Sequence, residues 1–352
     1  MQLSPIAAHR IAIREPVRTE VGTVGIKIVG TGAYLPERIA SNEDFARLVE
    51  TSDEWIVSRT GIRERHVATD MLNWEMGEKA AAQALSDAGV APGEVDMVIV
   101  STVTPDYLSP STACIIANAL GMEKPVCFDI NSACAAFVAA VDLAEKYLAS
   151  GSCKTVLVIS SEMLTKITDY TDRSTCVLFG DGAGAAVLRF ADAMYETDIG
   201  SDPTGCGKLF ARGVPPANPF REKAFDWAYD GLPETNGFGL HQDGRDVYKF
   251  ATRAMPAAVE SACQKAGIRV DELDWIFSHQ ANQRILETAA KNLGVPMDKF
   301  YVNIADHGNI SSACIPVCLA EASRSGALKR GDRICIVGFG AGLVYAASVF
   351  EW

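Results

Sequence analysis

An internal repeat limits the folds that this chain can adopt. Residues 88–101 (AGVAPGEVDMVIVS) have a counterpart in residues 266–279 (AGIRVDELDWIFSH), and in both segments an Ala-Gly pair is followed at the same spacing by an Asp and then by an apolar run. The two segments lie about half a chain length apart. A repeat at this distance indicates two similar halves.

A second pair of segments supports the repeat. Residues 132–134 (Ser-Ala-Cys) and residues 312–314 (Ser-Ala-Cys) each precede a helical segment that contains Leu-Ala-Glu. Helices alternate with short apolar runs, such as residues 155–160 and 333–338, which are typical of strands covered on both faces. This alternation predicts an α/β fold with layered sheets.

The length of 352 residues exceeds that of a usual single domain and fits two halves. A stretch rich in Gly, Pro and aromatic residues interrupts the alternation of helices and strands near the middle of the chain. We therefore expect an N-terminal extension at 1–25, a first half at 26–199, connecting and substrate loops at 200–244, and a second half at 245–352.

Charge and composition exclude several classes of function. A net charge of −12 argues against nonspecific nucleic-acid binding, which needs a basic surface. The ten cysteines include no CxxC pair, which argues against a metal site and is typical of a reducing compartment. No apolar run reaches the roughly 18 residues of a membrane span, and no basic segment followed by an apolar core opens the chain. We expect a cytoplasmic protein without metal or membrane partners.

Cys134 is the candidate nucleophile. It follows the apolar run 128–130 and opens an Ala-rich helical segment, so it is predicted to lie at a helix N-terminus, where free backbone N–H groups and the helix dipole favour the thiolate. The alternative for any cysteine is a buried apolar role. We assign that role to Cys114, Cys127, Cys153, Cys176, Cys263, Cys318 and Cys335.

Two polar residues of the second half are candidate partners of Cys134. His279 follows the apolar run of the second repeat segment, so it is predicted to lie at the C-terminal end of a strand, where open α/β sheets hold their sites. Asn309 lies in a turn-forming cluster before the second-half helix, and its amide can donate to a developing oxyanion. The alternatives are a structural histidine and a helix cap or Asx turn.

Several motifs in the same order carry a family resemblance. The chain resembles the thiolase superfamily, and within it most closely the β-ketoacyl-[acyl-carrier-protein] synthase III family, over nearly its whole length. The motifs are residues 27–36 (KIVGTGAYLP), 52–65 (SDEWIVSRTGIRER), 179–185 (FGDGAGA), 279–282 (HQAN) and 338–342 (GFGAG). The resemblance implies two similar halves in a layered α-β-α-β-α arrangement.

The resemblance also implies a reaction. Cys134 would take an acyl group from acyl-CoA, and His279 with Asn309 would bind the malonyl thioester of malonyl-acyl carrier protein while it loses carbon dioxide. The resulting carbanion would attack the acyl-cysteine, which is the decarboxylative Claisen condensation that initiates type II fatty-acid synthesis. The backbone N–H groups of Cys134 and Ala341 would hold the oxyanion. Ala341 replaces a glycine that is usual in the family.

Further contacts are implied in the same way. Acyl-CoA would be a substrate, no cofactor would be bound permanently, and the protein would be a homodimer. In the family a large aromatic residue often caps the acyl pocket across the dimer interface. Ser109 stands in its place, so we expect a pocket that admits primers longer than acetyl; the alternative is that Tyr107 or Leu108 fills the space. Asn292 stands where a second lysine of the carrier-docking patch is common. The expected CoA contacts are Trp55, Arg59, Arg173, Gly244 and Asn282, and the expected carrier-docking residues are Lys249, Arg284 and Lys291.

Other classes of function remain as alternatives. Residues 180–185 nominally fit a dinucleotide-binding turn, but they run into a strand-like segment and no acidic residue completes that site. An acyltransferase or a condensing enzyme of secondary metabolism would also keep Cys134, whereas the presence of both His279 and Asn309 favours condensation. A non-catalytic partner subunit would lack the nucleophile.

Overall fold

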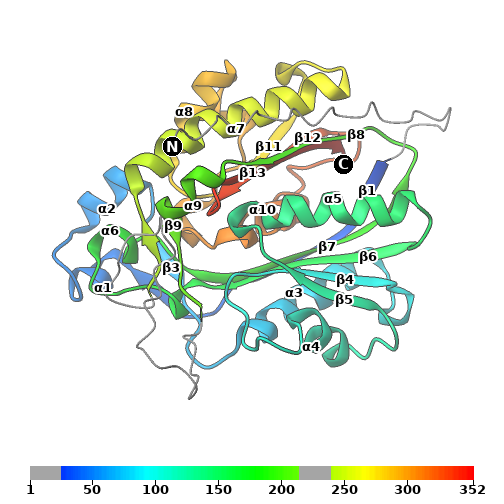
Figure 1. Ribbon diagram of the computed structural model, residues 1–352, viewed down its shortest axis with the longest axis horizontal. Coiled ribbons are helices and arrows are strands. Elements are labelled where there is room, and N and C mark those ends of the chain that lie inside the picture. Colours follow the sequence, from blue (N-terminus) through cyan, green and yellow to red (C-terminus); the bar gives the residue numbers. More distant parts are fainter. Residues whose placement is uncertain (1–24, 214–238) are drawn as a thin grey trace, which may run out of the picture.

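The computed structural model describes residues 25–213 and 239–352, and its main strands form two mixed sheets (Figure 1). In the first sheet β4 is parallel to both of its neighbours, β5 and β6, whereas β1, β7 and β6 pair antiparallel. Its spatial order is β1 (Gly25–Tyr34), β7 (Asp181–Ala191), β6 (Thr155–Met163), β4 (Met97–Ser101) and β5 (Val126–Ile130). The order in the second sheet is β8 (Tyr195–Ser201), β13 (Val344–Glu351), β12 (Arg333–Gly340) and β11 (Trp275–Ser278).

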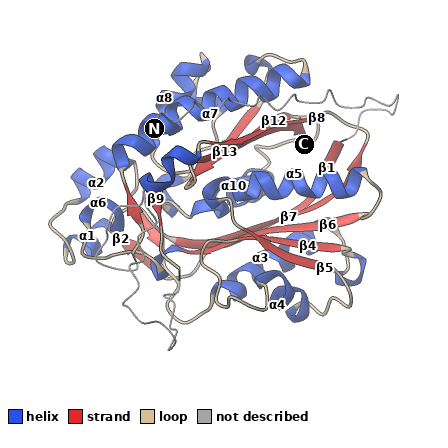
Figure 2. Ribbon diagram, in the orientation of Figure 1, coloured by secondary structure: helices blue, strands red, loops and turns tan. Residues whose placement is uncertain are grey.

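Helices cover both sheets and separate them, as Figure 2 shows. Helices α3 (Asn73–Ala88) and α4 (Thr112–Ala119) pack on the outer face of the first sheet. Helices α5 (Ala136–Ala149) and α10 (Cys314–Ser325) lie between the sheets and contact strands of both. Helices α7 (Gly244–Ala266) and α8 (Gln283–Leu293) form the outer layer on the second sheet. The predicted α-β-α-β-α layering is confirmed.

The burial of the strands explains why their sequences read as continuous apolar runs. Every residue of β4 and of β6 is buried, because helices cover both faces of their sheet. The central core cluster includes Phe137 from α5, Phe277 from β11 and Ile315 from α10, so it joins the two sheets through the middle helical layer. The relative position of the sheets therefore depends on how α5 and α10 pack.

The repeat segments take equivalent places in the two sheets. Gly89 caps the C-terminus of α3 and Gly267 that of α7, and both glycines have a left-handed φ, of 61° and 71°. A short 3₁₀ turn then leads into β4 in the first case and β11 in the second. The strand order β1-β7-β6-β4 in one sheet matches β8-β13-β12-β11 in the other. In the described part of the second sheet, the place equivalent to β5, beside β11, holds only an isolated bridge between Ile276 and Phe300.

The second repeat pair was predicted two residues out of register. The spacing that relates Ser101 to His279 also relates Asn131 to Asn309 and Cys134 to Ser312. The backbone shows the same register, because Ala133 and Ser311 both have a positive φ, of 45° and 53°, and each opens a 3₁₀ turn before α5 or α10. Two Ser-Ala-Cys tripeptides therefore suggested the wrong alignment, and the structural counterpart of the nucleophile is a serine.

The pairing of the strands does not follow the predicted division of the chain into segments. Most of β8 falls within the predicted first half, 26–199, yet β8 pairs with β13 in the second sheet. Strand β1 begins at Gly25, one residue before the predicted start of the first half. The predicted extension, 1–25, lies outside the described residues except for Gly25, as does much of the predicted loop region 200–244.

Short elements gather at one end of the layers and form the surroundings of the site. Strand β2 pairs with β3, and β9 pairs with β10. None of the helices in 25–213 and 239–352 is long and apolar enough to cross a membrane. The short elements are β2 (Ile39–Ser41), α1 (Asn42–Ala46), α2 (Asp53–Thr60), β3 (Glu64–His66), α6 (Arg173–Cys176), β9 (Leu209–Phe210), β10 (His241–Gln242) and α9 (Ile304–His307).

The cysteines are all free, but not all of them are buried. Cys114 is exposed on α4 and Cys127 on β5 is partly exposed, so the prediction of a core role was wrong for Cys114 and only partly right for Cys127. An amphipathic surface helix and an edge strand leave these side chains outside the core. The other five residues predicted to pack in the core, Cys153, Cys176, Cys263, Cys318 and Cys335, are buried.

Candidate active site

Cys134 lies where the chain leaves the first sheet and enters the middle helical layer. Strand β5 ends at Ile130, Asn131 Oδ1 accepts a hydrogen bond of 3.2 Å from the Ala133 N–H, and the 3₁₀ turn Ala133–Ala135 leads directly into α5. The predicted helix N-terminus is therefore present. The N-terminal backbone N–H groups of α5 and the positive end of its dipole lie next to the turn that carries Cys134.

Burial of Cys134 opposes the thiolate that this position is expected to favour. Burial raises the pKa of the Cys134 thiol to about 12, while a hydrogen bond from the Ser311 hydroxyl lowers it by a smaller amount. Desolvation disfavours the charged form of a buried thiol. Burial therefore favours the thiol over the thiolate before substrate binds.

A glycine-rich strand end packs directly behind the nucleophile. A Cβ atom at Gly340 would lie 2.7 Å from the Cys134 backbone nitrogen, and one at Gly338 would lie 2.8 Å from the Cys134 carbonyl oxygen. Only glycine allows β12 to approach the turn this closely. The chain then continues through Ala341, so the second half places a backbone segment beside Cys134.

His279 immediately follows β11, as predicted. Its own N–H donates to the Val337 carbonyl at 2.8 Å, its side chain is 2% exposed, and its ring meets the Phe339 ring edge-on at 5.2 Å between centroids. Burial lowers the pKa of His279 to about 3. The imidazole is therefore neutral at physiological pH and carries one N–H donor.

Asn309 is held so that its amide nitrogen is free to donate. Its Oδ1 accepts a hydrogen bond of 2.9 Å from the Ser311 N–H, its own N–H donates to the Leu178 carbonyl at 2.9 Å, and its carbonyl accepts from the Gly180 N–H at 3.0 Å. The predicted alternative, an Asx turn, is thus present as well. The turn fixes which side of the amide carries the two N–H donors.

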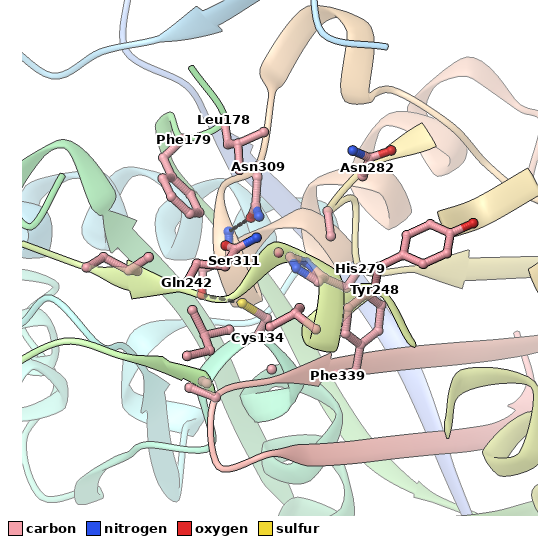
Figure 3. Close-up of a pocket in the computed structure, with 18 of the residues that line it drawn as sticks. Cys134, Leu178, Phe179, Gln242, Tyr248, His279, Asn282, Asn309, Ser311 and Phe339 are labelled. Atoms are coloured by element: carbon pink, nitrogen blue, oxygen red, sulfur yellow. Dashed lines mark hydrogen bonds between the residues drawn. The ribbon is translucent and has the colours of Figure 1, made fainter. Parts of the chain in front are cut away.

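A single cavity of about 1230 Å³ brings the predicted residues together (Figure 3). Cys134 and Ala341 contribute from the two sheets, and His279 and Asn309 lie around the sulfur on the same cavity wall. Apolar side chains such as Phe339 and Leu178 also line the cavity. The other predicted residues that line the cavity are Trp55, Arg59, Gly244, Lys249, Asn282 and Arg284.

Three predicted residues do not line this cavity in the single chain. Arg173 lies just outside it, with its guanidinium 5.0 Å from the Trp55 ring centroid. Lys291 is exposed on α8. Ser109 is exposed in the loop between β4 and α4.

Two guanidinium groups lie near the Trp55 ring at the mouth of the cavity. The Arg59 guanidinium lies 5.5 Å and the Arg173 guanidinium 5.0 Å from its ring centroid, and the indole is partly exposed. Arg173 also donates to the Glu50 carbonyl at 2.9 Å. A flat, electron-rich surface with two guanidinium groups suits a planar base that carries phosphates.

Asn282 and Gly244 lie at the N-termini of two helices beside the cavity. Asn282 caps α8 by accepting from the Arg284 N–H at 2.9 Å, and its Nδ2 donates to the Arg59 carbonyl at 3.0 Å. Gly244 is the first residue of α7, whose cap is Asp243. Both positions hold helix N-termini against the cavity wall.

The cavity also contains residues that the sequence did not single out. Ser311 Oγ lies 3.3 Å from Cys134 Sγ, and Arg245 adds a further exposed cation beside Lys249. Ser311 could have been found from the repeat, because the corrected register makes it the counterpart of Ala133 beside the nucleophile. Arg245 carries no such signal.

The glycine-rich segment 180–185 is not a nucleotide-binding turn. It forms the start of β7, where a Cβ at Gly184 would lie 2.8 Å from the Pro316 side chain on α10. The dehydrogenase alternative thus lacks the turn it needs. In the part of the chain that the structure describes, no group of three or more His, Cys, Asp and Glu side chains is placed to hold a metal ion.

Comparison with known proteins gives one consistent result. The family described as 3-oxoacyl-[acyl-carrier-protein (ACP)] synthase III matches residues 128–203, and its C-terminal part matches residues 263–352. A β-ketoacyl-[acyl-carrier-protein] synthase III of Clostridium acetobutylicum is 42% identical over 329 residues, which cover 93% of this chain and 98% of that protein.

Solved structures agree with the sequence matches. The crystal structure of 3-oxoacyl-[acyl-carrier-protein] synthase III from Aquifex aeolicus superimposes with a TM-score of 0.85 at 37% identity, over 93% of this chain and 100% of that one. The priming β-ketosynthase from the R1128 polyketide biosynthetic pathway gives a TM-score of 0.84 at 35% identity, over 95% of this chain and 98% of that one.

Proposed function

The chain belongs to the 3-oxoacyl-[acyl-carrier-protein] synthase III family, and from this we propose that it condenses an acyl-CoA primer with malonyl-acyl carrier protein to give a β-ketoacyl-acyl carrier protein. This reaction initiates type II fatty-acid synthesis. The observation that carries the proposal is that Cys134 from the first half meets His279 and Asn309 from the second half in one cavity.

The first step is acyl transfer to sulfur. The Cys134 thiol attacks the thioester carbonyl of acyl-CoA, the carbon–sulfur bond to CoA breaks, and the proton that the thiol gives up ends on the departing CoA, which leaves as CoA–SH. The backbone N–H groups of Cys134 and Ala341 are proposed to hold the oxyanion of the tetrahedral intermediate, an interaction worth about 3 kcal/mol per donor. The close packing of Gly340 on the Cys134 turn keeps these two backbone segments together.

The second step forms the carbon–carbon bond. His279, as a neutral donor, and the free amide N–H groups of Asn309 are proposed to bind the malonyl thioester carbonyl and to stabilise the enolate that remains when carbon dioxide leaves. The enolate carbon then attacks the acyl-Cys134 carbonyl, and the Cys134 sulfur departs. A histidinium would carry charge into a buried site, whereas the pKa of about 3 keeps the ring neutral.

The mouth of the cavity suits acyl-CoA as a substrate rather than a resident cofactor. We assign the adenine to the Trp55 ring, with Arg59 and Arg173 facing its phosphates. Because Arg173 already lies over the indole, it must swing away to complete a sandwich around the base. Gly244 and Asn282 would line the path of the pantetheine arm between this mouth and Cys134.

The direct test is to incubate the protein with a panel of acyl-CoAs, detect acyl-Cys134 by mass spectrometry, and then add malonyl-acyl carrier protein. Formation of a β-ketoacyl product is expected. An acyl-enzyme that forms and never condenses would instead support an acyltransferase. The panel includes acetyl-CoA and octanoyl-CoA, since Ser109 is proposed to admit longer primers, and a strong preference for acetyl would contradict that part.

The Ser109 proposal requires a second subunit, and the edge of the first sheet offers a place for one. Strand β5 is an edge strand on which Val126 is 53% exposed, and the loop that carries Ser109 exposes Leu108 at 85%. This loop joins α4, whose first N–H groups donate to Asp129 of β5. We propose a homodimer that pairs these edges and brings Ser109 to the partner's cavity, which sedimentation velocity would measure.

The acidic carrier protein is proposed to dock on the basic side chains around the cavity mouth. Lys249 and Arg284 lie there, Arg245 adds to the patch, and Lys291 extends it along α8. Asn292 does not supply a charge, because its Nδ2 donates to the Thr252 carbonyl at 3.0 Å and ties α8 to α7.

Charge reversal tests this docking patch. Lys249→Glu is expected to raise KM for malonyl-acyl carrier protein about tenfold, since a like charge facing an acidic partner costs on the order of 1.4 kcal/mol. The effect should shrink at high salt. Acylation by acyl-CoA is the internal reference, and Lys154→Glu, beyond the far end of α5, is the matched control. Equal effects of both variants on KM would remove Lys249 from the docking surface.

The location and the metabolic setting follow more indirectly. Ten free cysteines fit a reducing compartment, and we propose the cytoplasm. The similarity to a priming β-ketosynthase of a polyketide pathway keeps a condensing enzyme of secondary metabolism as the alternative. The chain length and identity of the carrier-bound product distinguish the two.

A further inference from the structure

A partly buried carboxylate on α10 has no part in the reaction as described above. Glu321 bonds with its two oxygens to the two ends of the one-turn helix α9. Its Oε2 accepts from the Asn303 Nδ2 at 2.9 Å, and its Oε1 accepts from the His307 Nε2 at 2.7 Å. Asn303 is the N-cap residue of α9, and His307 is its last residue. One side chain of the middle helical layer therefore bridges both ends of this short helix.

Helix α9 needs support from outside. A helix of four residues is too short to be stable by itself. Its cap residue, Asn303, makes no side-chain cap hydrogen bond, because both ends of its amide are used elsewhere. The Nδ2 donates to Glu321, and the Oδ1 accepts from the Cys318 thiol at 3.2 Å. Side chains of α10 thus hold α9 in place of a local cap.

The chain passes from α9 to the Asn309 donor in two residues. Gly308 follows His307 with a φ of 65°, and a Cβ atom there would lie 2.8 Å from the Arg65 side chain and 3.0 Å from the Leu178 carbonyl oxygen. This crowded backbone leaves little freedom between His307 and Asn309. A shift of α9 is therefore expected to move the Asn309 amide.

The other end of α9 is connected to the segment that carries His279. The Asn303 N–H donates to the Gln280 Oε1 at 3.3 Å, and Gln280, which is 0% exposed, directly follows His279. The Gln280 Nε2 donates to the Ser278 carbonyl at 2.9 Å and to the Tyr301 carbonyl at 3.1 Å. One buried set of hydrogen bonds thus runs from the residue beside His279 to the residue two positions before Asn309.

The directions of the bonds to Glu321 follow from its charge. Burial raises the pKa of Glu321, hydrogen bonds from His307 and Asn303 lower it, and the net pKa lies below the ordinary value. The carboxylate is therefore ionised at neutral pH and can only accept, so the His307 Nε2 carries a proton and donates it. Hydrogen bonds to a charged acceptor are stronger than neutral ones.

We propose that Glu321 is a positioning residue, which fixes the Asn309 amide relative to His279 by bridging the two ends of α9. Glu321 does not line the cavity, so it acts on the reaction through Asn309. Its effect falls on decarboxylation, the step to which Asn309 is assigned as a donor. This role rests on the proposed function, because it requires that Asn309 and His279 bind the malonyl thioester.

Two substitutions break the bridge to different extents. Glu321→Gln keeps the size of the side chain, but a Gln oxygen accepts from one donor while its NH₂ group faces the other. His307→Ala removes one of the two bonds and keeps the bond from Asn303, so it carries the test if Glu321→Gln fails to fold. Glu145→Gln is the matched control. Glu145 is a buried carboxylate of the other middle-layer helix, and its ion pair with Lys146 stays within α5.

The experiment measures two single-turnover rates for each protein, acylation of Cys134 by acyl-CoA and release of carbon dioxide from malonyl-acyl carrier protein. Glu321→Gln should lower the decarboxylation rate about 10- to 30-fold, as expected for a misplaced donor. The loss is smaller than for removal of the donor, since the Asn309 backbone stays bonded to Leu178 and Gly180. Acylation should stay within about threefold, and Glu145→Gln should keep both rates within about twofold.

A double-mutant cycle with Asn309→Ala separates positioning from general damage. In the Asn309→Ala background, Glu321→Gln should change the decarboxylation rate by less than about threefold, because the group that it positions is gone. A merely structural role would lower the rate by the same factor in both backgrounds. His307→Ala is taken through the same cycle.

The outcomes separate this proposal from the proposed function. Equal factors in the two backgrounds, or unchanged decarboxylation in both Glu321→Gln and His307→Ala, would overturn the positioning role. An unaltered protein that releases no carbon dioxide from malonyl-acyl carrier protein would instead overturn the proposed function.

Discussion

Cys134→Ala is expected to abolish acyl-enzyme formation and to lower the condensation rate by at least about ten-thousand-fold, on the order of the loss seen when other enzymes lose their nucleophile. The reason is that the described cavity wall offers no other group in the position of the Cys134 sulfur, between the α5 turn and β12. Intact-protein mass spectrometry after incubation with acyl-CoA measures the acylation, and product formation measures the condensation.

The matched control for this variant is a second cysteine of the same cavity. Cys206 also lines the cavity and is partly exposed, but it lies in a 3₁₀ turn, Pro203–Lys208, away from the α5 terminus. Cys206→Ala should retain activity within a few-fold. A Cys134→Ala protein that still became acylated, with Cys206 carrying the label, would move the nucleophile to the other cysteine.

The second large effect is expected at the donor pair. His279→Ala and Asn309→Ala should each lower the condensation rate by about 10²- to 10³-fold, the usual loss for a donor that binds a developing oxyanion. Acylation of Cys134 should stay within about tenfold, because neither side chain is assigned to that step. Single-turnover acylation and decarboxylation of malonyl-acyl carrier protein measure the two steps separately.

The pH dependence gives this prediction a further check. Because the pKa of His279 is lowered to about 3, the neutral donor form is present above that value and is lost only as the pH falls through it. The decarboxylation rate should therefore show no inflection from His279 between pH 5 and pH 9. His241→Ala is a suitable control, since His241 lies on β10 outside the cavity lining. A titration near pH 6.5 that disappears in His279→Ala would show that the ring is solvated.

The sequence predicted the layered fold well because the evidence for it was periodic and repeated. Helix-to-strand transitions at residues 88–101 and 266–279 share spacing, and both glycine caps have a left-handed φ. The register of the second pair was misjudged because identical letters, Ser-Ala-Cys, outweighed backbone conformation. The positive φ values of Ala133 and Ser311, which decide the register, leave no mark on the sequence.

The site was predicted in position but not in its electrostatics. Cys134, His279 and Asn309 line one cavity as expected, since each lies beside an end of an element that could be located from the sequence. The pKa values could not be foreseen, because they depend on burial by α5, α10 and the short elements around the mouth. The same holds for Glu162, whose buried carboxylate accepts from the Ser312 hydroxyl through a three-dimensional contact between β6 and the turn before α10.

The corrected register has a consequence for how the two halves can change. One of the two equivalent turn positions holds Cys134 and opens into the cavity, whereas the other holds Ser312, which is 0% exposed and bonds to Ser101 and Glu162. Ser101 in turn stands at the place equivalent to His279. A chain built from two copies of the first half would therefore lack His279, and a chain built from two copies of the second half would lack Cys134. Neither chain would form a complete site. The halves share an architecture but supply different residues to the site, so neither half can substitute for the other.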